Sequence, residues 1–248
     1  MTCFIVLPCF NEEDNVKLVV RSLDKAFKER MSYRIIAVND GSRDHTAGIL
    51  KNLSKSYPLI VVEHQTNQGL GAALRTGLIL AVKETRDDDF VVTMDSDNTH
   101  DPKHVLDMLL AAERADIVVG SRYVRGGRQL NVPAHRVFLS WCVNLLVKAL
   151  FQLPSKDNTS GLRCFRARLI KKLYVSFRAG IIESHGFVAS MELLLKAIRL
   201  GGTVVEVPIL LDYGKKGGVS KMRLFSTIVG YLTLFLKYMR LNNTKRIA

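Results

Sequence analysis

The sequence FVVTMDSD, residues 90–97, decides how the rest of the chain is interpreted. Its first part is an apolar run bounded by turn residues, which is typical of a buried β-strand. Side chains two positions apart on a strand share a face, so we predict that Asp95 and Asp97 present two carboxylates on one side at the strand's end. Ligands of open α/β sheets bind there, and two carboxylates form half of a Mg²⁺ or Mn²⁺ site that also uses phosphates. The alternative is an ordinary polar turn.

Strands and helices alternate along the first half of the chain. Besides the strand that begins at Phe90, we predict strands at residues 3–7, ended by Pro8, and at 34–38, 59–63 and 117–120. Strict alternation predicts right-handed crossovers and a mostly parallel sheet, so the predicted class is α/β. Polar residues follow four of the strands and predict one site built from four loops: Asn11, Glu12, Asp40, Asn67, Asp95 and Asp97.

Composition narrows the class of partner. The net charge of +13 favours polyanions, such as nucleic acid, anionic lipid headgroups or phosphorylated substrates. The four cysteines lack C-x-x-C spacing, which predicts neither a zinc site nor a disulfide framework and favours a reducing compartment. The start of the chain lacks the pattern of a signal peptide. No uninterrupted apolar run reaches the roughly 18–20 residues needed to span a bilayer.

Several familiar catalytic patterns are missing. Gly69-x-Gly71 matches only part of a dinucleotide-binding loop, because Leu74 stands at the third glycine position, and a simple strand-to-helix turn is the better interpretation. The sequence has no G-K-[ST] of a P-loop and no G-x-S-x-G nucleophile elbow. No H-E-x-x-H zinc pattern occurs. His100 and His104 lie four positions apart, but Pro102 between them favours a helix cap over a zinc site.

Two strongly apolar segments flanked by basic residues change the character of the second half. We predict helices at 135–151, which contains Trp141, and at 224–236. Such helices are typical of a membrane interface, so we expect contact with a membrane surface through 135–151 and 221–241. The alternative is two core helices that pack together. The predicted units are a catalytic domain, 1–220, that includes the first helix, and a C-terminal apolar and basic helix with a tail, 221–248.

Residues 214–221 form a glycine-rich basic loop. Lysines on such a backbone suit phosphate as point charges. Taken alone, the loop is better interpreted as a solvated surface segment whose charges aid solubility. The cations lie in glycine loops and at helix flanks without interleaved aromatic residues, so we expect no nucleic-acid partner.

Eight short pieces of the chain, in order from position 7 to position 221, resemble the family 2 inverting glycosyltransferases. Within that family they are similar to the polyprenol-phosphate sugar transferases of the dolichol-phosphate mannosyltransferase type. The pieces are LPCFNEE (7–13), VNDGS (38–42), NQGLGAA (67–73), MDSD (94–97), VGSRY (119–123), SGLR (160–163), EVPI (206–209) and GVSK (218–221).

The resemblance implies a glycosyltransferase A, Rossmann-like fold that moves a hexosyl group from a GDP-mannose or UDP-glucose type donor to polyprenyl or dolichyl phosphate, with inversion. It implies that Asp95 and Asp97 bind the metal. The implied catalytic residues are Asp97, Arg122 and Arg136. The implied nucleotide-binding residues are Pro8, Phe10, Asn11, Glu12, Asp40, Gln68, Asp95 and Ser96. The implied phosphate- and acceptor-binding residues are Arg122, Arg136, Ser160, Arg163, Lys215 and Lys221.

The chain departs from its relatives at three points. Thr99 stands where they often carry a third metal contact, Gln, and Lys215 stands where Arg is common and bidentate geometry is therefore lost. Some relatives continue into transmembrane helices. Either a partner anchors this chain or its interface helices suffice, and we expect a peripheral protein on the cytoplasmic face of a membrane.

Three functions are compatible with these patterns. The favoured one is transfer to a lipid phosphate, which is largely ionised at neutral pH and needs cations more than a strong general base. The second is a family 2 transferase with a soluble or saccharide acceptor. The third is a non-catalytic subunit that binds a nucleotide sugar.

Overall fold

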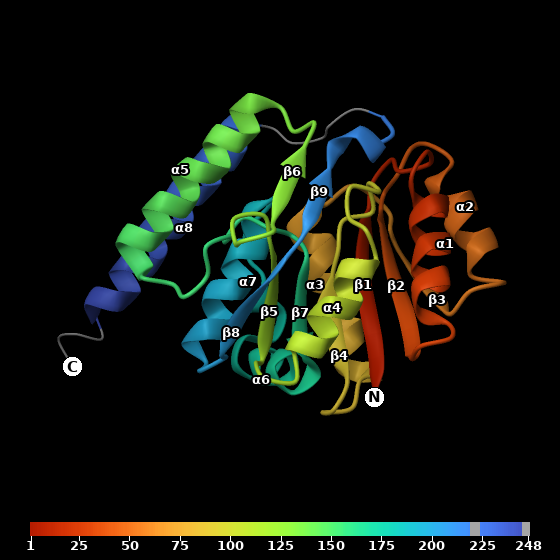
Figure 1. The fold of residues 1–248 in the computed structure, drawn as a ribbon, viewed down its shortest axis with the longest axis horizontal. Coiled ribbons are helices and arrows are strands. Elements are labelled where there is room, and N and C mark those ends of the chain that lie inside the picture. Colours follow the sequence, from red (N-terminus) through yellow and green to blue (C-terminus); the bar gives the residue numbers. More distant parts are fainter. Residues whose placement is uncertain (219–223, 245–248) are drawn as a thin grey trace.

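The computed structural model of the chain describes residues 1–218 and 224–244. The strands of its main sheet are β1 (Thr2–Cys9), β2 (Ser32–Asp40), β3 (Leu59–His64), β4 (Phe90–Thr93), β5 (Ile117–Ser121), β7 (Arg163–Arg166) and β8 (Val204–Pro208). They lie in the order β3-β2-β1-β4-β7-β5-β8 (Figure 1). Neighbours pair in parallel except at β7, which is antiparallel to β4 and β5. The predicted α/β class with a mostly parallel sheet is confirmed.

Helices cover both faces of this sheet (Figure 1). One face carries α1 (Val16–Phe27), α2 (Thr46–Leu53) and α4 (Lys103–Ala111), and the other carries α3 (Leu70–Glu84), α6 (Ala167–Phe177) and α7 (Val188–Arg199). The short 3-10 helix η1 (Arg178–Ile181) follows α6. Strands buried on both faces read as nearly continuous apolar runs, which is why β1, β2 and β5 were evident from the sequence.

The first strand is longer than predicted. Pro8 does not end it: β1 continues to Cys9, with Pro8 opposite Val38 of β2. On its other side, β1 pairs with β4 only as far as Val6, whose carbonyl accepts from the Met94 N–H. The backbone groups of alternate residues on a central strand face the same neighbouring strand. The backbone nitrogen of Pro8 therefore faces the same side as that of Val6, where β4 has already ended. Its missing N–H therefore breaks no ladder bond.

The antiparallel strand β7 follows from the path of the chain. After β5 the chain forms β6 (Arg128–Leu130) and α5 (Ala134–Phe151) beyond the carboxyl edge of the sheet (Figure 1). It then re-enters at that edge through residues 152–162. A parallel strand would require a crossover back to the amino edge, so the returning strand runs in the opposite direction. The strand β6 pairs in parallel with β9 (Leu210–Asp212), which precedes the 3-10 helix η2 (Tyr213–Lys215).

The two predicted apolar helices are present as α5 and α8 (Leu224–Thr244), which lie side by side at one end of the molecule (Figure 1). One face of each packs with α7 in a third core that includes Val147, Leu195 and Phe235. The opposite faces are exposed and apolar. The helices are therefore partly core elements, as the alternative interpretation held, and partly an open apolar surface. The predicted unit boundary at 220/221 lies outside the described residues.

Among the described helices, only α5 is long and apolar enough by length and composition to cross a membrane. At roughly 1.5 Å per residue its 18 residues extend about 27 Å. That length is slightly short of the roughly 30 Å hydrocarbon core of a bilayer.

Helix α3 crosses the sheet closely enough to require glycine at one position. A Cβ added at Gly77 would collide with the side chain of Val6 on β1. We predict that Gly77→Ala lowers the free energy of unfolding by about 1–3 kcal/mol, because overpacking forces a backbone or rotamer shift. Urea unfolding followed by circular dichroism measures the change.

Gly48 on α2 is the matched control, since a Cβ there meets nothing within 4 Å. Gly48→Ala should be neutral or stabilising by up to about 1 kcal/mol, as alanine is the better helix former. Equal stability for the two variants would contradict the close approach of α3 to β1.

Candidate active site

A cavity of about 720 Å³, here called the large cavity, lies where the carboxyl ends of β1, β2 and β4 meet. The last residues of β1 and β2 and the loops that follow β1, β3 and β4 contribute to it, as expected when parallel strands end at one edge. Residues that line it include Pro8, Glu12, Asp40, Asn67, Asp95 and Asp97.

The two aspartates that follow β4 lie in different environments. β4 ends at Thr93, so neither aspartate is on the strand, and the predicted strand alternation does not govern them. Both nevertheless line the large cavity. The side chain of Asp95 is 34% exposed, and its nearest ionisable partner is His100, with Nε2 3.6 Å from Oδ2. The side chain of Asp97 is only 13% exposed.

Both carboxylate oxygens of Asp97 have partners. Oδ1 accepts hydrogen bonds from the N–H and the hydroxyl of Thr99, at 3.2 and 2.6 Å. Oδ2 pairs with the ammonium of Lys216 at 2.6 Å. Burial raises the pKa of Asp97, but Lys216 and the hydrogen bonds lower it by more, so this pKa lies below its ordinary value. Thr99 thus orients Asp97.

The pair fits a hard divalent cation. Mg²⁺ is commonly held by one or two carboxylates together with water and substrate phosphates, so two acids suffice. Asp95 offers an accessible carboxylate, and Gly161 keeps the space beside it open, since a Cβ there would lie 3.3 Å from each of its carboxylate oxygens. Among the described residues no group of three or more His, Cys, Asp or Glu side chains forms a complete cage.

Asp40 holds the loop that precedes α3. Its Oδ1 accepts from the Gln68 N–H at 2.9 Å, and its Oδ2 accepts from the Gly69 N–H at 2.8 Å. His64 lies 2.7 Å from Oδ1 through Nδ1, and its Nε2 meets Thr76 at 2.9 Å. Gly69 has φ of 90°, a conformation that favours glycine. The buried Asp40 therefore shapes this wall of the large cavity through its hydrogen bonds.

The remaining predicted nucleotide-binding residues fall into two groups. Pro8, Phe10, Glu12 and Ser96 line the large cavity, and the Ser96 hydroxyl donates to the Pro8 carbonyl at 2.7 Å. Asn11 and Gln68 lie beside the cavity without lining it. The Asn11 side chain accepts from the Arg43 N–H at 2.8 Å, and the Gln68 side chain is exposed.

A second cavity of about 100 Å³, here called the small cavity, adjoins the first. Arg122 and Ser160 line it, whereas Asp95, Arg136 and Tyr213 line both cavities. Arg136 donates to the Tyr213 hydroxyl at 2.6 Å and lies over its ring. The buried Ser160 hydroxyl has no hydrogen-bond partner within the described part of the chain. The small cavity thus presents two guanidinium groups and an unsatisfied hydroxyl, a set that suits a small anion.

Three predicted phosphate-binding residues are not placed at either cavity. Arg163 is fully buried and donates to the carbonyls of Ser190 and Asn158. The exposed Lys215 does not line the two cavities. Lys221 lies outside the described residues.

Some residues at the site were not selected from the sequence. Lys216 brings the charge of the basic loop into the large cavity, next to the predicted Lys215, and the doublet of lysines was the available signal. Ser140 on α5 joins the small cavity, although it sits in a helix selected only for its apolar character. Asp157 binds Arg122, and no pattern in the sequence linked these two residues.

Comparisons with known proteins agree with this geometry. The family model described as Glycosyl transferase family 2 matches residues 4–174. The polyprenol monophosphomannose synthase of Mycolicibacterium smegmatis is 34% identical over 221 residues, covering 88% of this chain and 80% of that protein. The undecaprenyl-phosphate mannosyltransferase of Micrococcus luteus is 31% identical over 223 residues, covering 90% of this chain and 88% of that protein.

A solved structure supports the fold independently. Glucosyl-3-phosphoglycerate synthase from Mycobacterium tuberculosis, in complex with Mn²⁺, uridine diphosphate and glucosyl-3-phosphoglycerate, superimposes with a TM-score of 0.64 at 20% identity. The match covers 93% of this chain and 76% of that one. The family model covers well over half of the chain, and two relatives above 30% identity match most of its length. The chain therefore belongs to glycosyl transferase family 2.

Proposed function

We propose that this glycosyltransferase moves a hexosyl group from a nucleoside-diphosphate sugar to a polyprenyl phosphate, with inversion, at the cytoplasmic face of a membrane. The observation that carries the proposal is the meeting of the two cavities at Asp95 and Arg136, beside an exposed apolar surface on α5 and α8. The relatives' names point to the same acceptor class, a polyprenyl phosphate.

The large cavity takes the donor in this proposal. Its volume of about 720 Å³ lies within the range of roughly 300–1,000 Å³ typical of ligand sites. Pro8, Phe10 and Glu12, with the loop fixed by Asp40, form the wall that would receive the nucleoside. Asp95, Asp97 and Lys216 lie where the diphosphate would follow.

Asp95 and Asp97 would hold a divalent cation on the diphosphate. When bound, such a cation supplies Lewis-acid stabilisation of the charge that develops on the departing nucleoside diphosphate. Mn²⁺ or Mg²⁺ accompanies uridine diphosphate in solved structures of similar fold. Lys216, already paired with Asp97, is a cation of this chain's own within reach of the same phosphates.

The small cavity takes the acceptor phosphate in this proposal. Arg122 and Arg136 offset its charge and orient it, and the Ser160 hydroxyl can donate to a phosphate oxygen. An ionised phosphate is itself the nucleophile, so no protein base has to remove a proton. Entry from the side opposite the diphosphate gives inversion.

The exposed faces of α5 and α8 would rest on the membrane. Their outward apolar residues recur at helical spacing, so each helix presents one continuous stripe. On α5 the exposed residues include Phe138, Trp141 and Leu145, and on α8 they include Phe225, Val229, Leu232 and Leu236. Arg136, near the start of α5, lines both cavities, so this surface adjoins the acceptor entrance. A peripheral arrangement fits because the opposite faces are occupied by the third core.

A soluble phosphorylated acceptor is the second candidate. The observation favouring it is that phosphoglyceric acid accompanies a solved structure of similar fold. A non-catalytic subunit is the third possibility. The experiments that follow distinguish the three.

Asp97→Ala should lower sugar transfer by about 100-fold or more, because it removes a carboxylate proposed to hold the charge-stabilising cation. Transfer of radiolabelled mannose or glucose from GDP- and UDP-sugars to polyprenyl phosphate measures the effect. Asp107→Asn, an exposed carboxylate on α4, is the control and should retain activity. Full activity of a folded Asp97→Ala protein would contradict the assignment of Asp97 to the active site.

Lys216→Met should strengthen Mn²⁺ binding to the nucleotide-free protein by about tenfold or more. The reason is that the Lys216 ammonium competes with the cation for the same carboxylate. Isothermal titration with MnCl₂ measures the affinity directly and requires no turnover. The exposed Lys215→Met is the matched control and should bind Mn²⁺ as the wild type does. Unchanged Mn²⁺ affinity in Lys216→Met would show that the lysine does not compete with the cation for Asp97.

The protein alone should float with vesicles of phosphatidylcholine and phosphatidylglycerol. Phe225→Ser should weaken this partitioning by about 10- to 100-fold, the equivalent of losing one buried aromatic side chain. Phe225 is 80% exposed on α8, and the control Leu110→Ser replaces a residue that is 70% exposed on α4. If wild type and Phe225→Ser both stay in solution, the soluble acceptor is favoured.

A further inference from the structure

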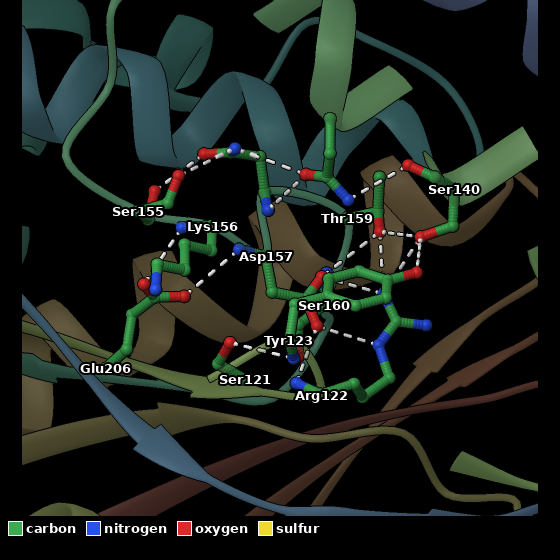
Figure 2. Close-up of polar contacts among 12 residues, drawn as sticks. Ser121, Arg122, Tyr123, Ser140, Ser155, Lys156, Asp157, Thr159, Ser160 and Glu206 are labelled. Atoms are coloured by element: carbon green, nitrogen blue, oxygen red, sulfur yellow. Dashed lines mark hydrogen bonds and ion pairs between the residues drawn. The ribbon is translucent and has the colours of Figure 1, made fainter. Parts of the chain in front are cut away.

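We propose that Asp157 is a positioning residue of the acceptor site: it fixes the Arg122 guanidinium so that one nitrogen, Nη1, is left for the acceptor phosphate. This inference rests on the function proposed above and assigns a role to the loop of residues 155–160. Figure 2 shows the loop and its polar contacts with Glu206 on β8, with the residues that follow β5 and with α5.

The contact between the two residues is bidentate. The Arg122 Nε donates to Oδ2 of Asp157, and Nη2 donates to Oδ1, both at 2.7 Å. The backbone N–H of Arg122 also donates to Oδ2, at 3.0 Å. A two-bond fork of this kind fixes the plane of the guanidinium as well as its position.

Further hydrogen bonds involve Nη2 of the Arg122 guanidinium. Nη2 also donates to the hydroxyl of Thr159 at 2.7 Å and to that of Ser140 at 3.2 Å (Figure 2). Nη1 has no hydrogen-bond partner among the described residues, and the Arg122 side chain lines the small cavity. Nη1 is therefore the guanidinium nitrogen that a ligand in the small cavity can reach.

Asp157 is itself held by Glu206 on the side away from Arg122. It is fully buried, and its N–H donates to Oε1 of Glu206 on β8 at 3.0 Å. Oε2 of Glu206 accepts from the Lys156 N–H at 2.9 Å (Figure 2). The N–H of Ser160 donates to Oδ1 of Asp157 at 3.1 Å. The order of contacts is thus Glu206, then Asp157, then Arg122, and only Arg122 of the three lines a cavity.

The same contacts make Asp157 unsuited to act as a base. Each of its carboxylate oxygens accepts at least two hydrogen bonds, and the side chain does not line either cavity. Burial raises the pKa of Asp157, but Arg122 lowers it by more, so the group stays ionised with its partner. Its effect on the reaction must pass through the groups that it binds, and Arg122 is the charged one among those that line the small cavity.

The network also includes the apolar helix. Ser140 of α5 contacts Tyr123 at 2.8 Å and Thr159 at 2.7 Å, and one turn later Asn144 accepts from the Asn158 N–H at 2.8 Å. The polar face of α5 is therefore bound to the loop that holds Arg122. These contacts fix the acceptor arginine relative to the surface proposed to lie on the membrane.

The test is a double-mutant cycle with farnesyl phosphate as the acceptor probe. Asp157→Asn should lower kcat/KM for the acceptor by about 10- to 100-fold, the usual effect of removing a supporting partner. Arg122→Ala should lower it at least as far. The double variant should match Arg122→Ala within about threefold, because both changes remove one unit. Titration with the nucleoside diphosphate of the active donor should give wild-type affinity in all three proteins.

Rescue of activity by free guanidinium distinguishes positioning of Arg122 from a purely structural role of Asp157. At low millimolar concentration it should restore part of the acceptor kcat/KM to Arg122→Ala, since Asp157 can hold it in the vacated position. It should not restore activity to the double variant. If Asp157→Asn does not fold, Glu206→Gln takes its place. That change removes one of two backbone acceptors and should raise the acceptor KM several-fold without changing nucleotide affinity.

Asp89→Asn is the matched control, a buried carboxylate that accepts from the N–H groups of Thr2 and Arg86 at the opposite edge of the sheet. It should leave the acceptor KM unchanged. Two results would overturn the positioning role. One is that the losses of acceptor kcat/KM in the two single variants add in the double variant, and the other is that guanidinium rescues the double variant as well as Arg122→Ala. Failure of the wild type to use farnesyl phosphate would instead overturn the proposed function, so the two failures are distinguishable.

Discussion

Buried carboxylates along the carboxyl edge of the sheet have to be compensated, and this electrostatic requirement shapes the site. A carboxylate removed from water is costly unless it is paired or hydrogen-bonded. Asp40 is satisfied by two backbone N–H groups and His64, Asp97 by Thr99 and Lys216, and Asp157 by Arg122. Apart from the local partner Thr99, these partners come from segments that are distant in sequence.

Compensation also separates supporting groups from groups available to a ligand. The carboxylate oxygens of Asp40 and Asp157 accept hydrogen bonds from protein groups and fix those groups in place. Asp95, which is a third exposed and lines both cavities, and Arg136, which also lines both, remain accessible. Lys216 is intermediate, because a flexible side chain can exchange one anionic partner for another. Donor and acceptor would therefore meet where Asp95 and Arg136 line both cavities.

The apolar helices place this site at a surface. Each uses one side for the core shared with α7 and leaves the other exposed, so neither description, core helix or interface helix, is complete. The polar residues of α5, Ser140 and Asn144, face the loop that holds Arg122. One helix thus presents an apolar stripe outward and hydrogen-bonding groups to the small cavity, an arrangement that would keep the proposed transfer close to a lipid surface.

The sequence by itself determined the α/β class, the parallel core strands, the gathering of polar residues at one edge of the sheet and the two apolar helices, because these follow from local periodicity and from the geometry of parallel sheets. Only the tertiary structure decided which charged side chains line a cavity. Arg163 and Arg122 look alike in sequence, yet one is buried against carbonyl groups and the other lines a cavity. Lys216 reaches Asp97 across 119 positions. Pairings of that kind depend on how loops pack, and no local pattern encodes them.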